Sequence, residues 1–338
     1  MKQKKLKIQK NTDLMKSSLK SFQNLNILVV GDVILDVFLY GESNRISPEA
    51  PIPVVEIKKE LMALGGAGNV AANLASLGIN THLVGLIGED VEGDHIKSLL
   101  KQYKINDNLF FTDKRNTTVK TRVVAASQQL IRFDKESKNK IDKYNTLEVI
   151  KKIDTIIDII DAIIISDYGK GLITKSLIEE ISNRVKKHNI ILTVDPKIEH
   201  FYMYKNVFCL TPNQKEASEA TKINIESEKD LIRCGNTILK KLKCNSLIIT
   251  RGPLGMTLFN GKDSPVHIKS VAKEVYDVTG AGDTVISIFT AAKTCGYDTI
   301  KAAELANMAA GIVVSKIGTA TMTLDELHRA IEGVKWKY

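Results

Sequence analysis

Short apolar runs rich in β-branched residues alternate with amphipathic stretches from about residue 26 onward. The runs have the length of buried strands, and we expect strands at 26–30, 82–87, 162–166, 190–194, 207–210 and 246–250. The stretches that separate and follow them have helical spacing, and we expect helices at 67–77, 94–103, 145–160, 174–188, 227–243, 284–295, 299–315 and 323–334. Buried strands that alternate with helices predict an α/β fold with a doubly wound, mostly parallel sheet.

Two segments break this alternation. Residues 37–59 mix polar and β-branched residues with three prolines, and residues 117–134 alternate apolar and polar side chains, which is typical of a half-exposed strand. Together they would form a small antiparallel sheet beside the main one, either as surface hairpins without function or as a lid over a cleft. We favour the lid, because both segments border glycine-rich motifs.

Positive charge is concentrated at the N-terminus. The first twenty residues hold seven lysines and one aspartate, a net charge of +6, so the rest of the chain carries +3 of the total of +9. We expect residues 1–25 to be a basic, disordered leader and residues 26–338 to form one domain. The leader lacks the apolar core of a secretory signal. Binding of the leader to nucleic acid or to an anionic membrane surface is the alternative.

The composition also bears on cellular location. No window approaches the ~18 apolar residues of a membrane span, so we expect no membrane partner. The cysteines show neither CxxC spacing nor histidines at zinc-ligand intervals; they are Cys209, Cys234, Cys244 and Cys295. We expect reduced thiols, which fits a cytoplasmic protein.

The stretch DVTGAGDT, residues 277–284, is the strongest chemical signal. A strand-like run at 265–275 precedes it and a helical run follows it. Gly280, Ala281 and Gly282 can turn their backbone N–H groups toward one point, where the helix dipole favours an anion. Asp283 then places a carboxylate beside that anion, which suits a base that takes a proton from a hydroxyl attacking phosphorus. The alternative is that Asp283 merely caps the helix.

Other polar motifs follow strand ends, where open α/β sheets bind ligands. Asp32 follows the first strand, and the segment Gly65 to Asn69 opens a helix, where its glycines permit close approach of a substrate. That segment also reads as G-x-G-x-x-A, a weak dinucleotide-binding fingerprint. Asn213 and Glu216 lie one helical turn apart and can hold Mg²⁺ directly or through water. The later segment Thr250 to Met256 suits a nucleotide.

These motifs together resemble the ribokinase-like (PfkB) carbohydrate kinases. The resembling stretches run from about residue 27 to about 320 and include VVGDVILDVFLYG, GGAGNVAANLASLG, SDYGKG, TPNQKE, TRGPLGM and YDVTGAGDT. Two further stretches, SPEAPIPVV and QQLIRFD, narrow the likeness to the branch of D-glycero-β-D-manno-heptose 7-phosphate kinases of ADP-heptose synthesis.

The resemblance implies a role for each matching residue. Asp283 resembles the catalytic base, and Gly280, Ala281 and Gly282 the anion hole. The residues that would bind the nucleotide are Asn213, Gln214, Lys215, Glu216, Thr250, Arg251, Gly252, Gly255, Asn307 and Gly311. The residues that would bind the sugar are Asp32, Gly65, Gly66 and Asn69, with Arg122, Arg132, Lys170 and Lys197 as candidates for its distal phosphate.

The activity implied is ATP- and Mg²⁺-dependent phosphorylation of the anomeric O1 of heptose 7-phosphate, a step toward ADP-heptose for lipopolysaccharide core. The lid would pair with a second subunit's lid in a homodimer. The sequence shows no HxGH-type cytidylyltransferase domain, so we expect a separate adenylyltransferase to act on a downstream product. The alternatives are a PfkB kinase for another sugar or sugar phosphate, and a dinucleotide-dependent oxidoreductase.

Overall fold

A single eight-stranded sheet forms the centre of the molecule. The computed structural model describes residues 19–107, 111–113, 115–126, 128–261, 263–272 and 274–333. The strand order is β14-β13-β12-β11-β10-β9-β1-β4, parallel from β4 to β12 and antiparallel at β13 and β14. The strands are β1 Asn26–Gly31, β4 Asn80–Val84, β9 Ala162–Ser166, β10 Ile191–Asp195, β11 Cys209–Leu210, β12 Ser246–Thr250, β13 Met256–Asn260 and β14 Val266–Ile268.

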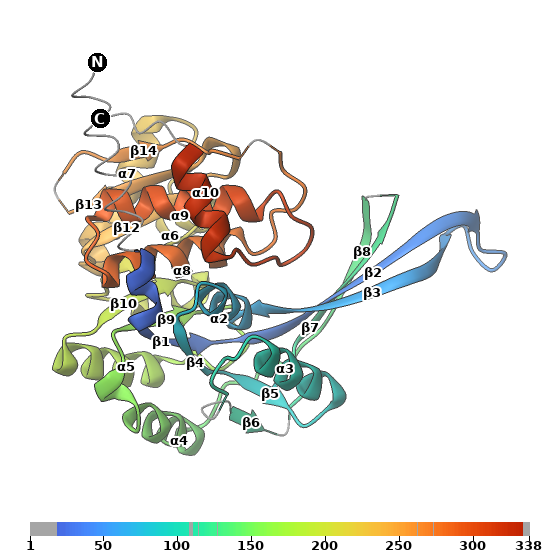
Figure 1. The fold of residues 1–338 in the computed structure, drawn as a ribbon, viewed down its shortest axis with the longest axis horizontal. Helices are drawn as coiled ribbons and strands as arrows, with labels where there is room; N and C mark the ends of the chain where they lie inside the picture. Colours follow the sequence, from blue (N-terminus) through green and yellow to red (C-terminus); the bar gives the residue numbers. More distant parts are fainter. Residues whose placement is uncertain are drawn as a thin grey trace.

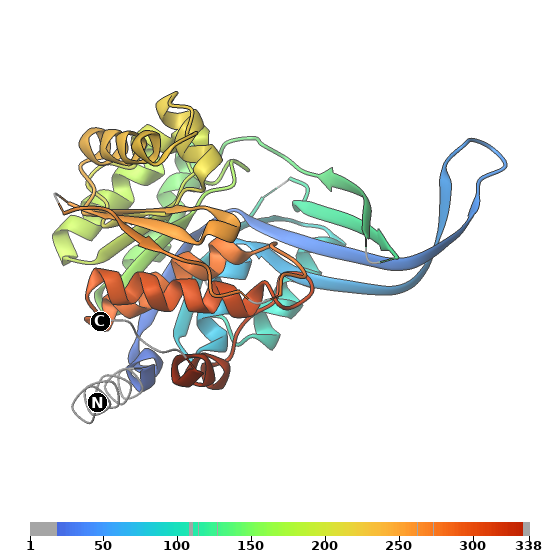
Figure 2. The same cartoon turned by 90° about the horizontal axis from the view of Figure 1, so that it is seen from above.

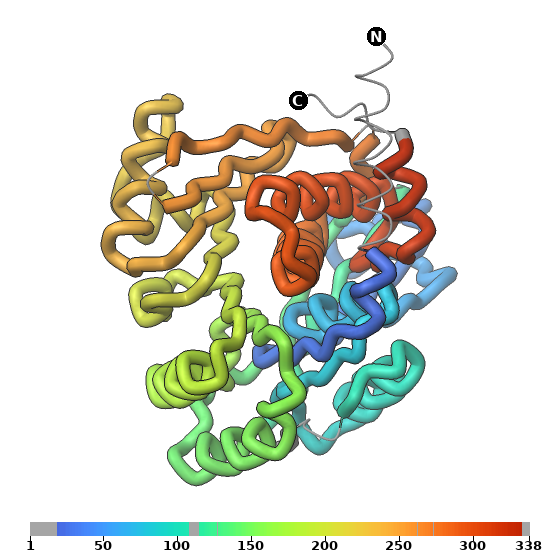
Figure 3. Tube along the Cα trace, turned by 60° about the vertical axis from the view of Figure 1, so that its left-hand side comes forward, coloured from blue at the N-terminus to red at the C-terminus, as the bar shows by residue number. Residues whose placement is uncertain are grey.

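Helices cover both faces of this sheet. The helical segments are η1 Lys20–Asn24, α2 Ala67–Ser76, α3 Val91–Gln102, α4 Lys143–Asp154, η2 Ile157–Ile159, α5 Lys175–His188, η3 Ile198–Met203, α6 Gln214–Thr221, α7 Glu228–Leu242, η4 Gly252–Leu254, α8 Ala281–Thr294, α9 Thr299–Val313 and α10 Leu324–Gly333. Figure 3 shows α4 and α5 on the opposite side of β1 from α8 and α9.

Alternation along β1 divides the core into two clusters. Ile27 and Val29 pack against residues of α2, α8 and α9, whereas Leu28 and Val30 pack against residues of α4 and α5. A strand buried on both faces must be apolar at every position. This requirement explains why the predicted strands are continuous apolar runs.

A four-stranded lid projects from the body, as Figures 1 and 2 show. Its order is β3-β2-β7-β8, with β2 and β7 parallel and the outer pairs antiparallel. The strands are β2 Val33–Ile46, β3 Pro53–Gly66, β7 Val119–Ala125 and β8 Gln128–Lys135. Both segments expected in the lid are strands of this sheet, although β2 begins at Val33 and β3 ends only at Gly66. The expected antiparallel sheet is instead mixed, because β2 and β7, which join the two segments, run parallel. A separate parallel pair lies below, formed by β5 Leu86–Gly88 and β6 Phe111–Asp113.

The doubly wound fold and the six expected strands are confirmed, with differences at their ends. The run 82–87 splits, because β4 joins the main sheet while β5 pairs with β6. The expected strand 265–275 is short, since only Val266–Ile268 pairs with β13. The expected helix 145–160 ends at Asp154, and the helix expected from 284 already begins at Ala281.

The expected leader is wrong for its last residues. Leu19 and Phe22 are fully buried in the core cluster of α2 and α8, and η1 carries them. Residues 1–18, which hold most of the lysines, lie outside the described residues. Leu19, Phe22 and Leu25 recur every three residues, a helical spacing that the lysine-rich composition of the segment obscured. Within the described ranges, no helix is long and apolar enough to cross a membrane.

Shortening Phe22 should destabilise the fold. We expect Phe22→Ala to lower the free energy of unfolding by about 3–5 kcal/mol, because it removes a fully buried aromatic ring. Lys20→Ala, an exposed neighbour on the same turn, is the control and should change it by less than about 0.5 kcal/mol. Urea unfolding of both variants measures the difference. Equal stability of the two variants would show that η1 is not part of the core.

Candidate active site

The first turn of α8 carries the central carboxylate. Gly280 precedes the helix in the left-handed region, at φ 81°, and Asp283 is the third helical residue. The Asp283 side chain is 3% exposed and accepts hydrogen bonds from Asn69 Nδ2 and from the Tyr168 hydroxyl, each at 2.8 Å. It makes no capping bond to its own helix. The capping interpretation is therefore wrong, and the carboxylate instead joins three elements.

The backbone before Asp283 leaves donors available for an anion. Among the described residues, the N–H groups of Gly280, Gly282 and Asp283 have no backbone acceptor, whereas the Ala281 N–H donates to the Val278 carbonyl at 3.3 Å. A Cβ on Gly280 would lie 2.4 Å from Asn69 Nδ2, so only glycine fits there. The anion hole stays a prediction: Gly280 and Gly282 keep donors that could serve it, whereas the Ala281 donor is engaged inside the turn.

The pKa of Asp283 suits a general base. Burial raises it to about 6, while the hydrogen bonds from Asn69 and Tyr168 favour the charged form and limit the rise. The nearby Asp36 raises this pKa further and Lys120 lowers it. A carboxylate with a pKa near neutrality takes protons more readily than an ordinary aspartate.

Helix α2 holds the base in place through a chain of amides. Asn73 Nδ2 donates to Asn69 Oδ1 at 3.2 Å, and Thr284 Oγ1 donates to Asn73 Oδ1 at 3.0 Å. The chain runs from α8 through α2 and back to Asp283. Asn69, expected at the sugar site, thus contacts the base directly.

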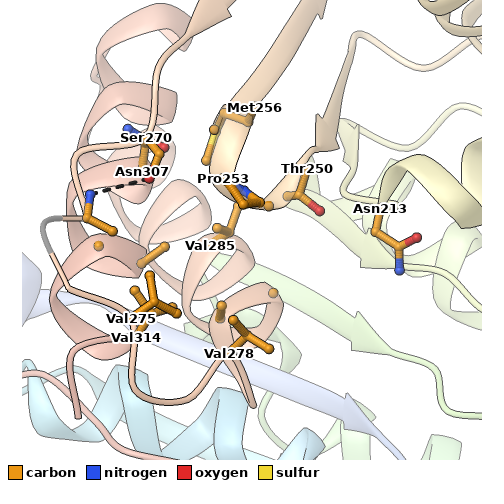
Figure 4. A pocket seen from close by; sticks show the side chains of 17 residues that line it. Asn213, Thr250, Pro253, Met256, Ser270, Val275, Val278, Val285, Asn307 and Val314 are labelled. Carbon is orange, nitrogen blue, oxygen red and sulfur yellow. Dashed lines mark hydrogen bonds between the residues drawn. The ribbon is translucent and has the colours of Figure 1, made fainter. Parts of the chain in front are cut away.

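A cavity of about 420 Å³ opens beside the turn before α8, within the usual size range of small-molecule sites. Six of the predicted nucleotide residues line it: Asn213, Thr250, Gly252, Gly255, Asn307 and Gly311. Figure 4 shows Val275, Val278 and Val314 together on one side of it, with Thr250 and Asn213 on the other. The apolar wall suits the nucleobase of a nucleotide, and the polar end suits its phosphate chain.

A second cavity adjoins the first. Gln214, Lys215 and Arg251 line it together with Asn213 and Thr250. The Arg251 Nε is buried and has no hydrogen-bond partner among the described residues. Because a buried donor is costly to leave unpaired, this orphaned atom fits an anionic ligand such as a nucleotide phosphate.

A third, acidic cavity of about 230 Å³ connects the base to the nucleotide side. Asp195, Glu216, Lys197 and Gly282 line it. Burial and the charges of Glu216 and Asp283 raise the pKa of Asp195 well above its usual value, and burial raises that of Glu216. Carboxylates that repel one another in a buried space suit a divalent cation.

The details differ from direct chelation by Asn213 and Glu216. Asn213 Oδ1 accepts from the Glu216 N–H, and Glu216 Oε2 accepts from the Asn213 N–H, each at 2.9 Å. This capping box leaves Glu216 Oε1 and the Asp195 carboxylate as candidate ligands. The described part of the chain holds no cluster of three His, Cys, Asp or Glu side chains fit for a metal. Two carboxylates, those of Asp195 and Glu216, are enough for Mg²⁺, which keeps several waters and binds one or two carboxylates together with phosphates.

The lid carries its cations on one face. Lys120 and Arg122 alternate along β7, and Arg132 lies directly opposite Arg122 on β8. Arg122 is paired with Asp36 at 2.6 Å and is buried, whereas Arg132 is half exposed and paired with Asp134 at 3.0 Å. Lys120 has no carboxylate within 4 Å among the described residues, and its Nζ lies 5.3 Å from the Tyr168 ring centroid. This face therefore adjoins the base.

The other predicted phosphate ligands are placed differently. Lys170 is paired with Glu136, and Lys197 lines the acidic cavity near Glu216. These two lysines, one on the lid side and one on the nucleotide side, do not share the lid face with Arg122 and Arg132.

The sequence suggested that Asp32 binds the sugar, but its carboxylate is occupied by backbone donors. It is 2% exposed, and its carboxylate accepts from the backbone N–H groups of Tyr168, Lys170 and Leu172 at 2.9, 3.0 and 3.3 Å. Asp32 therefore shapes the loop after β9. Asp36 lies four residues further along the chain, in β2, and its charge acts on Asp283. It also packs against Gly65, where a Cβ would lie 2.3 Å from Asp36 Oδ2. Gly66, at φ 57°, ends β3 and starts α2.

Three residues that the sequence did not single out belong to the site. They are Lys120, Tyr168 and Asp195. Asp195 belongs to the strand-end stretch DPK, in which only Lys197 was assigned a role from the sequence. Lys120 alternates in step with Arg122, which was a usable signal. Tyr168 lies in the strand-end stretch SDYGKG, which the sequence did mark, but its contact with Asp283 spans 115 residues and was not predicted.

The main sheet is doubly wound and carries a β lid, and a glycine-rich turn holds a buried aspartate beside a cavity of nucleotide size. This combination is typical of sugar kinases of the ribokinase-like class. The chain belongs to the pfkB family of carbohydrate kinases, whose model matches residues 24–326. Kinases of this family use ATP with Mg²⁺.

The chain is also similar to longer curated proteins. It is 42% identical over 312 residues to the bifunctional protein HldE of Desulfatibacillum aliphaticivorans, covering 92% of this chain and 64% of that protein. It is 43% identical over 305 residues to HldE of Aliarcobacter butzleri, covering 90% and 63%. The chain thus spans under two thirds of the length of these relatives. Both relatives are bifunctional by name, so the expected separate adenylyltransferase stays a prediction.

Solved structures agree on the fold. Phosphofructokinase-2 from Escherichia coli, in complex with substrates and products, superposes with a TM-score of 0.75 at 19% identity, covering 91% of this chain and 98% of that one. Arabidopsis thaliana ribokinase, complexed with ribose and ATP, gives 0.72 at 19% identity, covering 92% and 99%.

The pKa of Asp283 predicts an acid limb in the activity. A general base must be ionised, and the pKa of Asp283 in the enzyme without substrate is about 6. We therefore expect kcat/KM to fall about tenfold per pH unit below that pH. The sign follows from the raised pKa, because protonation removes the base as the pH falls through it. Initial rates of ADP release between pH 4.5 and 8 measure the limb. A kcat/KM that stays flat down to pH 4.5 would contradict the assignment.

Proposed function

We propose that this chain transfers the γ-phosphoryl group of ATP to the anomeric O1 of D-glycero-β-D-manno-heptose 7-phosphate. The product would be the 1,7-bisphosphate, a precursor of ADP-heptose for lipopolysaccharide core. The kinase class is shown by the family, whereas this acceptor is our inference. Identities of 42% and 43% to HldE proteins over at least 90% of this chain support it.

One observation carries the choice of a phosphorylated acceptor. Lys120 lies over the ring of Tyr168, and the Tyr168 hydroxyl contacts Asp283. Arg122, two residues further along β7, and Arg132 opposite it lie on the same face of the lid. A substrate with its reacting hydroxyl at Asp283 would thus extend toward cations. A sugar with a phosphate at its far end matches that charge pattern, and arginine suits such a phosphate through bidentate bonds.

The residues would divide the work as follows. Asp283 takes the proton from O1 as the oxygen attacks phosphorus. The N–H groups of Gly280 and Gly282 stabilise negative charge on the transferring group, with the α8 dipole behind them. Mg²⁺, held near Asp195 and Glu216, would supply further charge neutralisation on the phosphates. The lid would exclude water, which otherwise competes as the acceptor.

A kinase for another sugar phosphate is the nearest alternative, since the same cations would serve it. The dinucleotide-dependent oxidoreductase is disfavoured by the fold. The G-x-G-x-x-A stretch follows β3, a lid strand that is antiparallel to β2. In the helix that it opens, Asn69 donates a hydrogen bond to Asp283. A dinucleotide fingerprint needs a parallel βαβ unit instead. The nucleic-acid alternative rests on residues 1–18, which lie outside the described residues.

We further propose a homodimer formed through the lid. Ile131 and Phe133 on β8 are 57% and 53% exposed, and they lie on the face of the lid opposite Arg122. Exposed apolar side chains grouped on a projecting sheet favour a protein partner. A cytoplasmic location is proposed as well, supported by four free cysteines of which three are buried.

Asp283→Asn tests the base. We expect kcat with heptose 7-phosphate to fall about 10²–10⁴-fold, while ATP binding stays unchanged. Asp298→Asn is the matched control, because Asp298 is also an aspartate at a helix start but caps α9 far from the cavity. ADP release and ATP titration calorimetry measure the two effects. Turnover of Asp283→Asn within a few-fold of the wild type would refute the assignment.

Arg132→Ala tests the phosphate end of the acceptor. Loss of a charge-assisted hydrogen bond costs about 1.5–3 kcal/mol, so KM for heptose 7-phosphate should rise about 10- to 150-fold with KM for ATP unchanged. Arg233→Ala is the control, since the Arg233 side chain is also exposed, 66% against 50% for Arg132, and is paired with a local aspartate on α7. A rise in the ATP constant alone would remove Arg132 from the sugar site.

The same variant tests the dimer. If the lid serves the neighbouring subunit, mixing Arg132→Ala with Asp283→Asn protein restores activity, because one hybrid site then has both residues intact. No recovery on mixing would place Arg132 in its own subunit's site.

A further inference from the structure

Tyr168 lies between the base, the main sheet and the lid. It follows β9, and its backbone N–H donates to Asp32 Oδ2 at 2.9 Å, which fixes the start of the loop. Its hydroxyl donates to Asp283 Oδ1 at 2.8 Å. The Lys120 ammonium of the lid lies over its ring, 5.3 Å from the centroid. The phenol is thus held at its backbone, its face and its hydroxyl.

The two oxygens of Asp283 each receive one side-chain donor. Asn69 donates to Oδ2 and Tyr168 donates to Oδ1, from opposite elements of the fold. Two donors on two oxygens define the plane of the carboxylate, and each oxygen keeps acceptor capacity for an incoming hydroxyl. Both bonds favour the ionised form over the protonated one.

We propose that Tyr168 is a positioning residue for the base: its hydroxyl orients the Asp283 carboxylate and favours the ionised form that accepts the substrate's proton. This inference rests on the proposed role of Asp283. It assigns Tyr168 no contact with the reacting atoms. Without the hydroxyl, the carboxylate would keep only the Asn69 donor, could rotate, and would hold its proton to higher pH.

Other groups also face the carboxylate. Asp36 and Lys120 approach from the lid, Asp195 from the end of β10, and the neutral Asn69 from α2. None of them changes in Tyr168→Phe, so a shift in that variant reports the lost hydroxyl. Tyr204→Phe is the matched control, because the Tyr204 hydroxyl donates to a different buried carboxylate, Asp167, at 2.6 Å.

The direct test follows the carboxyl carbon of Asp283 by NMR in ¹³C-aspartate-labelled protein, with the signal assigned by its loss in Asp283→Asn. We expect its titration midpoint to move up by about one to two pH units in Tyr168→Phe and to stay in place in Tyr204→Phe. Replacing Tyr168 by 3-fluorotyrosine, a stronger donor, should move the midpoint down. Coincident midpoints in the wild type and Tyr168→Phe would overturn the proposal, as would equal shifts in both tyrosine variants.

Kinetics separate this proposal from the proposed function. The acid limb of kcat/KM should move up with the NMR midpoint in Tyr168→Phe, and KM for ATP should not change. A loss of activity equal at every pH, with an unmoved limb, would overturn the positioning role. Full turnover in Asp283→Asn would instead refute the base. The NMR midpoint needs no substrate, so it gives its result even if the acceptor is another sugar phosphate.

Discussion

The burial of one carboxylate organises the whole catalytic end of the molecule. Asp283 is 3% exposed, and a buried charge is tolerated only when donors surround it. Those donors come from α2 through Asn69 and from the loop after β9 through Tyr168. The Asp283 carboxylate therefore has both of its donors only when α2, α8 and β9 are docked. Fold stability and catalytic geometry share the same contacts.

The lid depends on a second buried ionic contact. Arg122 and Asp36 are paired at 2.6 Å between adjacent parallel strands, with the Arg122 guanidinium 5.2 Å from the Phe38 ring centroid. A buried ion pair adds little net stability, but breaking it leaves an uncompensated charge. The pair thus fixes the register of β2 against β7 more than it strengthens the lid. That register places Lys120 beside Tyr168, while the separate pairing of β7 with β8 sets Arg132 opposite Arg122.

The sequence predicted those features that are local. The turn at Gly280 to Asp283 is a continuous motif, and the nucleotide residues follow strand ends that meet at one sheet edge. Contacts between distant segments were not predictable in the same way. Arg122 and Lys170 were expected to be available for a phosphate, yet their partners Asp36 and Glu136 lie 86 and 34 residues away. The role of Asp32 was missed for the same reason, since its partners are backbone amides some 136 to 140 residues on.

The distribution of charge in the site matches the two ligands proposed for it, a nucleotide with Mg²⁺ and a sugar phosphate. Asp283, Asp195 and Glu216 crowd one side of it, and the pKa of each is raised. A Mg²⁺ ion held near Asp195 and Glu216 would relieve the repulsion between these two carboxylates, and its positive charge would also favour the ionised form of Asp283. On the other side, the phosphate of the proposed acceptor would meet the lid cations Lys120 and Arg132. In the function proposed here, the metal ion would therefore lower the pKa of Asp283 from one side of the site, while the lid would hold the sugar phosphate on the other.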